Sequence, residues 1–257
     1  MLKRISKQIA VLTVEDLVIF PGLVVPLVVK DKRSMKLVDW VLGTKDKSVG
    51  IFTLKSPKLD ERKERNFYHI GVASNIIKML RFPDESVRIM VQGLSRAKIH
   101  KIVSREPFMK ADIELIKERE ASKDLELEAL MRGVESAFQR IGKLAQIPDE
   151  MQIQAINIKE PGKLADFVAS SIPFTVKEKQ KVLEAFDVKE RLFCLLSLLA
   201  KEENILGLGE KIRNNVKSEF GKNQREFFLR EQLKAIKKEL GEKDEREAEI
   251  DELKKKM

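Results

Sequence analysis

The chain has 257 residues, 43% of them hydrophobic and 35% charged, and its formal net charge is +9. The apolar share excludes a disordered chain, and the length allows one large or two ordinary domains. Its single cysteine, Cys194, excludes an internal disulfide framework, and its apolar neighbours predict a buried thiol in a reducing, cytoplasmic compartment. We expect neither a signal peptide nor a membrane span, because the longest uncharged stretch, 17–29, is short and contains two prolines.

The positive charge lies in the first part of the chain. Residues 1–120 hold 24 Lys and Arg against 15 Asp and Glu, whereas the remainder holds 26 of each kind. A basic domain attracts polyanions by counterion release, which leaves a nucleic-acid partner open. The single Trp and single Tyr offer little for base stacking and favour a solvated lysine-rich surface instead.

Short β-branched runs fill residues 1–117. QIAVLTV and LVVPLVV stand on either side of an FPG turn, and SVGIFTL follows a helical stretch in which Met35, Val38 and Leu42 share one face. The run VRIMVQGL, from Val87, alternates apolar and polar side chains. Many strands with one inserted helix predict an antiparallel β-rich barrel or sandwich that carries a helix.

From about Glu118 the hydrophobic period changes from two to 3.6, which predicts a helical bundle over residues 118–187. Its features are an apolar stripe of Leu127, Leu130, Val134, Phe138, Ile141 and Leu144, and capping signatures at Asp149 with Gln152, Thr175 with Glu178, and Asp187 with Glu190.

Residues 188–257 contain no proline and predict one long helix that stops near Gly241. Fifty helical residues would extend about 80 Å, which a core of this size cannot bury. The apolar residues near the end of this helix have a spacing typical of a coiled coil, which predicts that this part contacts a partner helix. We call it the assembly helix, and its candidate contact residues are Phe228, Leu229, Leu233, Ile236 and Leu240. Three glycines leave its continuity open: Gly207, Gly209 and Gly221. The apolar spacing continues to Leu253 without a cap, so we expect a longer protein.

Catalytic and nucleotide-binding motifs are absent from the sequence. Gly142, Gly162 and Gly221 each precede a Lys, but none continues into a phosphate-binding loop. His69 and His100 have no second ligand at metal spacing. We therefore predict no catalytic residue, no metal and no cofactor in this chain.

The FPG turn is the candidate substrate contact. Phe20, Leu23 and Val24 would form an apolar surface able to hold an unfolded segment. Most apolar runs of this kind belong to the core, and the sequence favours that interpretation of this run.

Several stretches resemble one known family. QREFFLREQLKAIKKELGE, residues 224–242, closely resembles the helix that precedes the ATPase module in the Lon family of ATP-dependent serine proteases. LTVEDLVIFPGLVVPLVV, HIGVASNIIKMLRFPDESVRIMVQGLSRAKI and KQKVLEAFDVKERLFCLLSLLAKEENIL resemble, in order, its opening, its second strand block and its entry into the long helix. The resemblance covers nearly the whole chain.

The resemblance implies an α+β architecture. A β-rich, PUA-like domain would occupy residues 1–117, a helical bundle 118–187, and a long helix 188–257, ending just before an AAA+ ATPase module and a protease module. The full-length protein would be an ATP-dependent serine endopeptidase of protein quality control, with ATP and Mg as cofactors and a hexameric assembly. No position of this chain matches the family's catalytic or nucleotide-binding residues.

For this region the resemblance implies recognition of unfolded, damaged or degron-bearing proteins and support of hexamer assembly. Two alternatives stay open. The first is a nucleic-acid or polyanion-binding PUA-like module, and the second is a purely structural assembly element.

Overall fold

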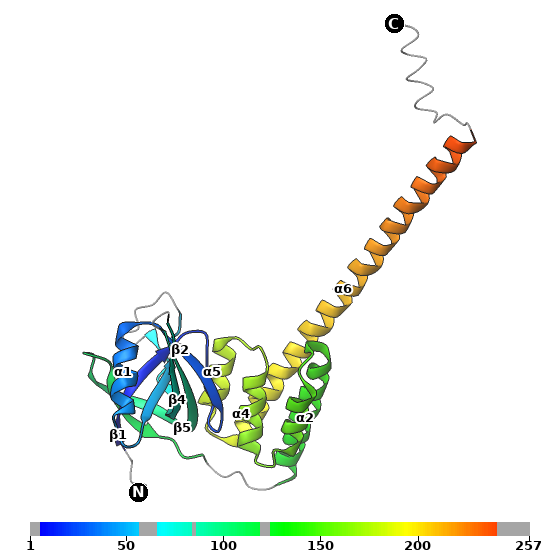
Figure 1. Ribbon diagram of the computed structural model, residues 1–257. Helices are drawn as coiled ribbons and strands as arrows, with labels where there is room; N and C mark the ends of the chain where they lie inside the picture. Colours follow the sequence, from blue (N-terminus) through cyan, green and yellow to red (C-terminus); the bar gives the residue numbers. More distant parts are fainter. Residues whose placement is uncertain (1–5, 57–65, 84–85, 119–123, 241–257) are drawn as a thin grey trace. The chain divides into compact units, whose positions relative to one another are not determined.

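The computed structural model describes residues 6–56, 66–83, 86–118 and 124–240 (Figure 1). The chain forms two compact units, Met1–Glu203 and Asn204–Met257. The first contains the strands β1 (Ser6–Val14), β2 (Val24–Val29), β3 (Ser48–Thr53), β4 (Ile70–Arg81), β5 (Val87–Ser104) and β6 (Lys110–Leu115). The helices are α1 (Lys32–Leu42), α2 (Leu125–Ala145), α3 (Asp149–Asn157), α4 (Pro161–Ser171), α5 (Val176–Glu184) and α6 (Val188–Glu239).

Five strands close into a barrel. β5 pairs with β4 on one side and with β6 on the other, and the β3–β4, β1–β3 and β1–β6 pairs complete the ring. β2 lies along β5 as a sixth strand. The expected antiparallel order is wrong for one pair, because β1 and β3 run parallel. The chain crosses over through β2 and α1 between these two strands, so they enter the sheet in the same direction.

Alternate side chains of β5 point to opposite faces of the strand, as the sequence predicts. Val87, Ile89 and Val91 are buried, whereas Arg88 and Met90 are exposed. The barrel core lies on the buried side and contains Ile9, Val11, Phe52, Phe67, Ile99 and Ile113. On α1, the buried residues are Leu37, Val38 and Val41, so the face that contains Val38 packs inward, with Met35 and Leu42 partly exposed.

Three of the predicted helix starts can be compared with the structure. Thr175 and Glu178 form the predicted capping box. Asp187 accepts hydrogen bonds from the backbone N–H groups of Lys189 and Glu190. The signature at Asp149 is wrong, because α3 begins after Pro148 with no side-chain cap, and the amide of Gln152 donates to the Ile147 carbonyl instead.

The helix α6 spans 52 residues and includes Gly207, Gly209 and Gly221. Its first turns, with Leu192, Leu195 and Leu199, are buried in the first unit. The predicted stop at Gly241 lies outside the described residues. Cys194 is half-buried rather than buried, and this burial raises the pKa of its thiol. β6 ends at Leu115 and α6 begins at Val188, but division of the chain at residues 117 and 187 stays a prediction.

Candidate functional site

The predicted apolar surface at the FPG turn reaches the protein surface only in part. Phe20 is fully buried, which agrees with the core interpretation of this run, so its inclusion in the candidate contact surface is wrong. Leu23 is half-buried, and Val24 is 46% exposed. Contact of these residues with a substrate stays a prediction.

Gly93 explains why the turn faces inward. The N–H of Gly22 donates to the Gly93 carbonyl, and the N–H of Gly93 donates to the Leu23 carbonyl, each at 2.9 Å. A Cβ atom at Gly93 would lie 2.5 Å from the carbonyl oxygen of Phe20, so only glycine allows this approach. These two hydrogen bonds hold the turn against β5, and in this position the side chain of Phe20 lies in the core.

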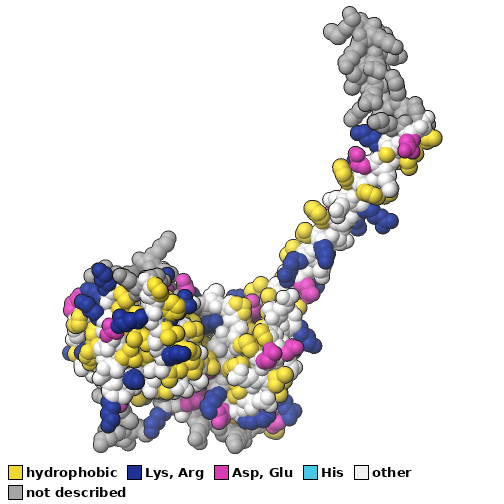
Figure 2. Space-filling view, viewed as in Figure 1, with side chains coloured by type: hydrophobic (Ala, Val, Ile, Leu, Met, Phe, Trp, Pro, Cys, Tyr) yellow, Lys and Arg dark blue, Asp and Glu magenta, His cyan; other side chains and the backbone are white. Residues whose placement is uncertain are grey.

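Val24 belongs to a larger apolar surface on the outer face of three paired strands, which we call the strand-face patch. Its exposed fractions are large, for example 56% for Val28, 55% for Ile77 and 50% for Leu94. Figure 2 shows hydrophobic side chains gathered on the strand-rich part of the molecule, with Lys and Arg among them. The patch consists of Val24, Pro26 and Val28 from β2, Ile77 and Leu80 from β4, and Met90 and Leu94 from β5.

The strand register arranges the patch in rows across the sheet. One row runs Pro26, Met90, Lys78. The next runs Val28, Arg88, Leu80. Neighbouring strands lie about 4.8 Å apart, so each row offers a contact surface about 10 Å wide, enough for one extended peptide segment.

The edge of β2 is poorly suited to pairing with another strand. Among the described strands β2 pairs only with β5, and Pro26 stands in its middle. A proline has no N–H to donate, and edge prolines are a common protection against strand addition. A partner would therefore contact the side chains of the patch rather than the backbone of its edge.

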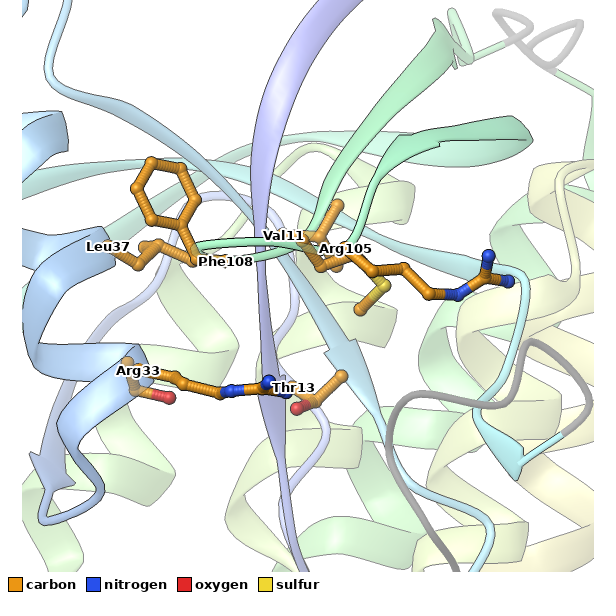
Figure 3. A pocket seen from close by; sticks show the side chains of 8 residues that line it. Val11, Thr13, Arg33, Leu37, Arg105 and Phe108 are labelled. Carbon is orange, nitrogen blue, oxygen red and sulfur yellow. The ribbon is translucent and has the colours of Figure 1, made fainter.

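A small pocket lies between α1, β1 and the connection from β5 to β6 (Figure 3). The lining includes the apolar side chains of Leu37 and Phe108 and the long side chains of Arg33 and Arg105, together with Val11, Thr13, Ser34 and Met109. Arg33 pairs with Glu106. The volume of about 40 Å³ is sufficient for a water molecule but far below the several hundred Å³ typical of ligand sites.

The two histidines lie apart from any cluster of metal ligands. Within the described parts of the chain, no group of three His, Cys, Asp or Glu side chains is placed to hold a metal ion. His100 lies on the strand surface with Nε2 2.8 Å from Glu114, and His69 lies beside Phe67. No helix within the same ranges is long and apolar enough to cross a membrane.

A network of buried ion pairs and hydrogen bonds joins the barrel to α4, α5 and the first turns of α6. Arg96 of β5 donates to both carboxylate oxygens of Asp166 on α4, at 2.9 and 2.6 Å, and to the Leu183 carbonyl. Arg191 of α6, fully buried, donates to Glu118 and to the Ala185 carbonyl. Burial raises the pKa of Asp166, while the hydrogen bonds from Arg96 act against this rise. No spacing in the sequence indicated this network, because Arg96 and Asp166 are 70 residues apart.

The residues of the predicted assembly helix are all exposed, with exposed fractions from 53% for Leu229 to 71% for Leu240. Other exposed apolar residues precede them along α6: Ile205, Leu208, Ile212, Val216 and Phe220. These five apolar residues follow one another at intervals of three or four positions, which places them on one side of the helix.

Comparison with known proteins identifies the family. Residues 8–201 match the family described as the ATP-dependent protease La (LON) substrate-binding domain. The chain belongs to the Lon family. It is 41% identical over 254 residues to a Lon protease of Dictyoglomus thermophilum and 37% identical over 253 residues to one of Syntrophomonas wolfei, covering 98% of this chain in both cases. It spans about a third of the length of these Lon relatives, 32% and 31% respectively.

The fold agrees with solved Lon structures. The N-terminal domain of a Mycobacterium avium complex Lon protease superposes with a TM-score of 0.64 at 23% identity, covering 76% of this chain and 98% of that one. A Lon N-terminal domain protein of Xanthomonas campestris gives 0.54 at 14% identity. The predicted α+β class is thereby confirmed.

Proposed function

We propose that this chain is the substrate-recognition region of an ATP-dependent Lon-type serine protease, and that the strand-face patch holds unfolded or damaged protein. The observation that carries the proposal is the group of exposed apolar side chains on β2, β4 and β5. Unfolded chains expose apolar segments that native proteins bury, so such a surface distinguishes the two states. The family match to a substrate-binding domain supports this role.

The proposal for the whole protein follows its relatives. It would couple ATP hydrolysis, with Mg, to proteolysis in modules beyond this region, in the cytoplasm. Each Val or Leu side chain that leaves water contributes at most about 1.5–3 kcal/mol, and ordering the bound chain offsets much of it. A single patch should therefore bind weakly, and several copies in a hexamer would raise the affinity by multivalency.

We assign a second role to α6. Leu229, Leu233 and Ile236 are exposed at coiled-coil spacing, and burial against another helix would remove this apolar surface from water. We propose that this row supports assembly of the oligomer. In the alternative of a purely structural element, assembly through α6 would be the only role of the region.

The charge of the barrel favours one further candidate, a nucleic-acid or polyanion-binding module. Phosphate contacts by Lys and Arg would account for such binding, which should fall steeply with salt. Apolar recognition should persist in salt, so ionic strength separates the two candidates.

The test is a titration of the protein, by fluorescence anisotropy, against a labelled chemically unfolded protein and its native form at low and high salt. We expect preference for the unfolded form in both. Replacing Val28, Leu80 and Met90 by Ser should abolish that preference. The matched control replaces three apolar residues exposed on helices, Leu125, Ile153 and Phe193, by Ser. Equal loss in both triple variants would contradict the assignment of the patch.

A further inference from the structure

We infer that the strand-face patch selects apolar segments that carry acidic side chains and rejects segments rich in Lys and Arg, with Lys78 and Arg88 as the residues that set this specificity. The inference rests on the proposed function and assigns the chemical class of its substrates. Its occupant is an extended peptide of another protein that has apolar residues with one or two Asp or Glu among them.

The charge composition of the three strands is one-sided. The sequences of β2, β4 and β5 contain no Asp or Glu, whereas β4 and β5 together contain six Lys and Arg. Arg96 is buried and paired with Asp166, so its charge is not offered to a bound peptide. Arg88 and Lys78 are exposed in the middle of the patch. A bound segment therefore meets apolar and positive groups but no negative group from these strands.

The register fixes where the two charges lie. Arg88 stands between Val28 and Leu80, and Lys78 stands beside Met90 in the next row. Arg88 and Lys78 are thus diagonal neighbours on adjacent strands, about 7 Å apart at their Cβ atoms. Alternate residues of an extended peptide repeat at a similar spacing, so two acidic side chains at positions i and i+2 can reach both cations.

Lys78 and Arg88 differ from two other arginines of the same unit, which are paired with carboxylates. Arg81, at the end of β4, is 2.5 Å from Asp39 of α1, and Arg33 is paired with Glu106. No carboxylate of the described residues pairs with Lys78 or Arg88. The Arg88 guanidinium lies 4.3 Å from the centre of the Phe82 ring, a cation–π contact that orients the group and leaves its charge available. Asp84 and Glu85, in the connection from β4 to β5, lie outside the described residues.

Charge at such exposed positions changes affinity modestly. An exposed pair of opposite charges contributes up to about fivefold in affinity, and a like-charge pair acts in the opposite direction. A typical exposed pair changes the affinity by about twofold, so two sites should separate an acidic from a basic peptide by about tenfold at low ionic strength. The Debye length shortens from about 10 Å at 0.1 M salt to about 3 Å at 1 M, so the separation should shrink with salt while binding of the apolar core persists.

The experiment uses three labelled peptides with one apolar core and two variable positions, occupied by Asp, Ser or Lys. We expect the Asp peptide to bind most tightly and the Lys peptide about tenfold more weakly at low salt. The double variant Lys78→Glu with Arg88→Glu should reverse this order. The control variant Lys45→Glu with Lys47→Glu, exposed before β3 and outside the patch, should keep it.

Each result has a distinct meaning. Equal binding of the Asp and Lys peptides, or an order unchanged by the double variant, would overturn the charge selectivity while leaving apolar recognition intact. Absence of binding by all three peptides would overturn the proposed function as well. Polyglutamate binding as tightly as the Asp peptide would show that charge alone suffices, which would also overturn selection of apolar acidic segments in favour of a polyanion site.

Discussion

Arg96 and Asp166 form a buried, two-pronged ion pair that connects the barrel to the helices. The two terminal nitrogens of the Arg96 guanidinium, Nη1 and Nη2, lie 2.9 and 2.6 Å from the two Asp166 oxygens, and both side chains are 5% exposed. Gln180 of α5 adds a second link by donating to the Ile70 carbonyl at 2.9 Å. These bonds fix β4 and β5, which carry most of the strand-face patch, to the helical part of the same unit.

Breaking the buried pair should destabilise the first unit. Asp166→Asn or Arg96→Met leaves one buried partner uncompensated, and such losses amount to about 3–5 kcal/mol. We expect urea unfolding to report this loss for either single variant. The double variant Arg96→Met with Asp166→Leu should recover part of it. The exposed pair of Arg140 and Glu203 provides the control, where Glu203→Gln should cost less than about 1 kcal/mol. Equal costs at the two pairs would contradict a special role for the buried one.

Acid should weaken the start of α5. The hydrogen bond from Lys201 and then the hydroxyl of Thr175 lower the pKa of Glu178 to about 2. Because the folded-state pKa is below the unfolded one, the stabilisation is present above about pH 4.5 and is lost as pH falls toward 2. Lys201 is exposed, so solvent limits the effect to about 1 kcal/mol.

The measurement is the melting temperature between pH 7 and pH 3. In Glu178→Gln we expect a smaller fall on acidification than in the parent protein, by about 2–4 °C. Glu150→Gln, at an exposed carboxylate of α3, should behave as the parent does. Parallel curves for the Glu178 variant and the parent would contradict the assignment.

Gly93→Ala should destabilise the turn that precedes β2. The new methyl would lie 2.5 Å from the Phe20 carbonyl oxygen, so the backbone must shift, at a cost of about 1–3 kcal/mol. Gly207→Ala is the opposite case, because a methyl group there would meet no atom within 4 Å and alanine favours a helix by up to about 1 kcal/mol. Thermal unfolding of both variants distinguishes steric conflict from glycine removal as such, and a tolerated Gly93→Ala would refute the close approach.

The apolar row of α6 should control self-association. We expect replacement of Leu229, Leu233 and Ile236 by Ser to weaken it at least about tenfold in sedimentation velocity, because a coiled-coil contact depends on these side chains. The control variant replaces Arg230, Lys234 and Lys237, which are exposed on the same helix, by Ser. It should self-associate as the parent protein does. Self-association unchanged in the apolar variant would remove this row as the contact.

Local features of this protein could be predicted from the order of its residues. Alternation in VRIMVQGL defined the two faces of β5, the spacing of Val134, Phe138 and Ile141 defined the buried stripe of α2, and Thr175 with Glu178 marked a helix start. These signals depend on residues within a few positions of one another, which is why no knowledge of the folded chain is needed to recognise them. The family was also visible in contiguous stretches.

Long-range relationships became known only from the folded chain. Barrel closure requires β5 to pair with β4 and β6, and the strand-face patch exists because Val28, Leu80 and Met90 meet through the pairing of β2, β4 and β5. The sequence allowed Phe20 either a surface or a core position, and Gly93, far away in the sequence, forms the backbone contacts that hold the turn with Phe20 inward. Arg96 and Asp166 give no local signal of their bond. Hydrophobic pattern reports which side of an element is buried, whereas the partner that buries it is chosen by packing between segments distant in the chain.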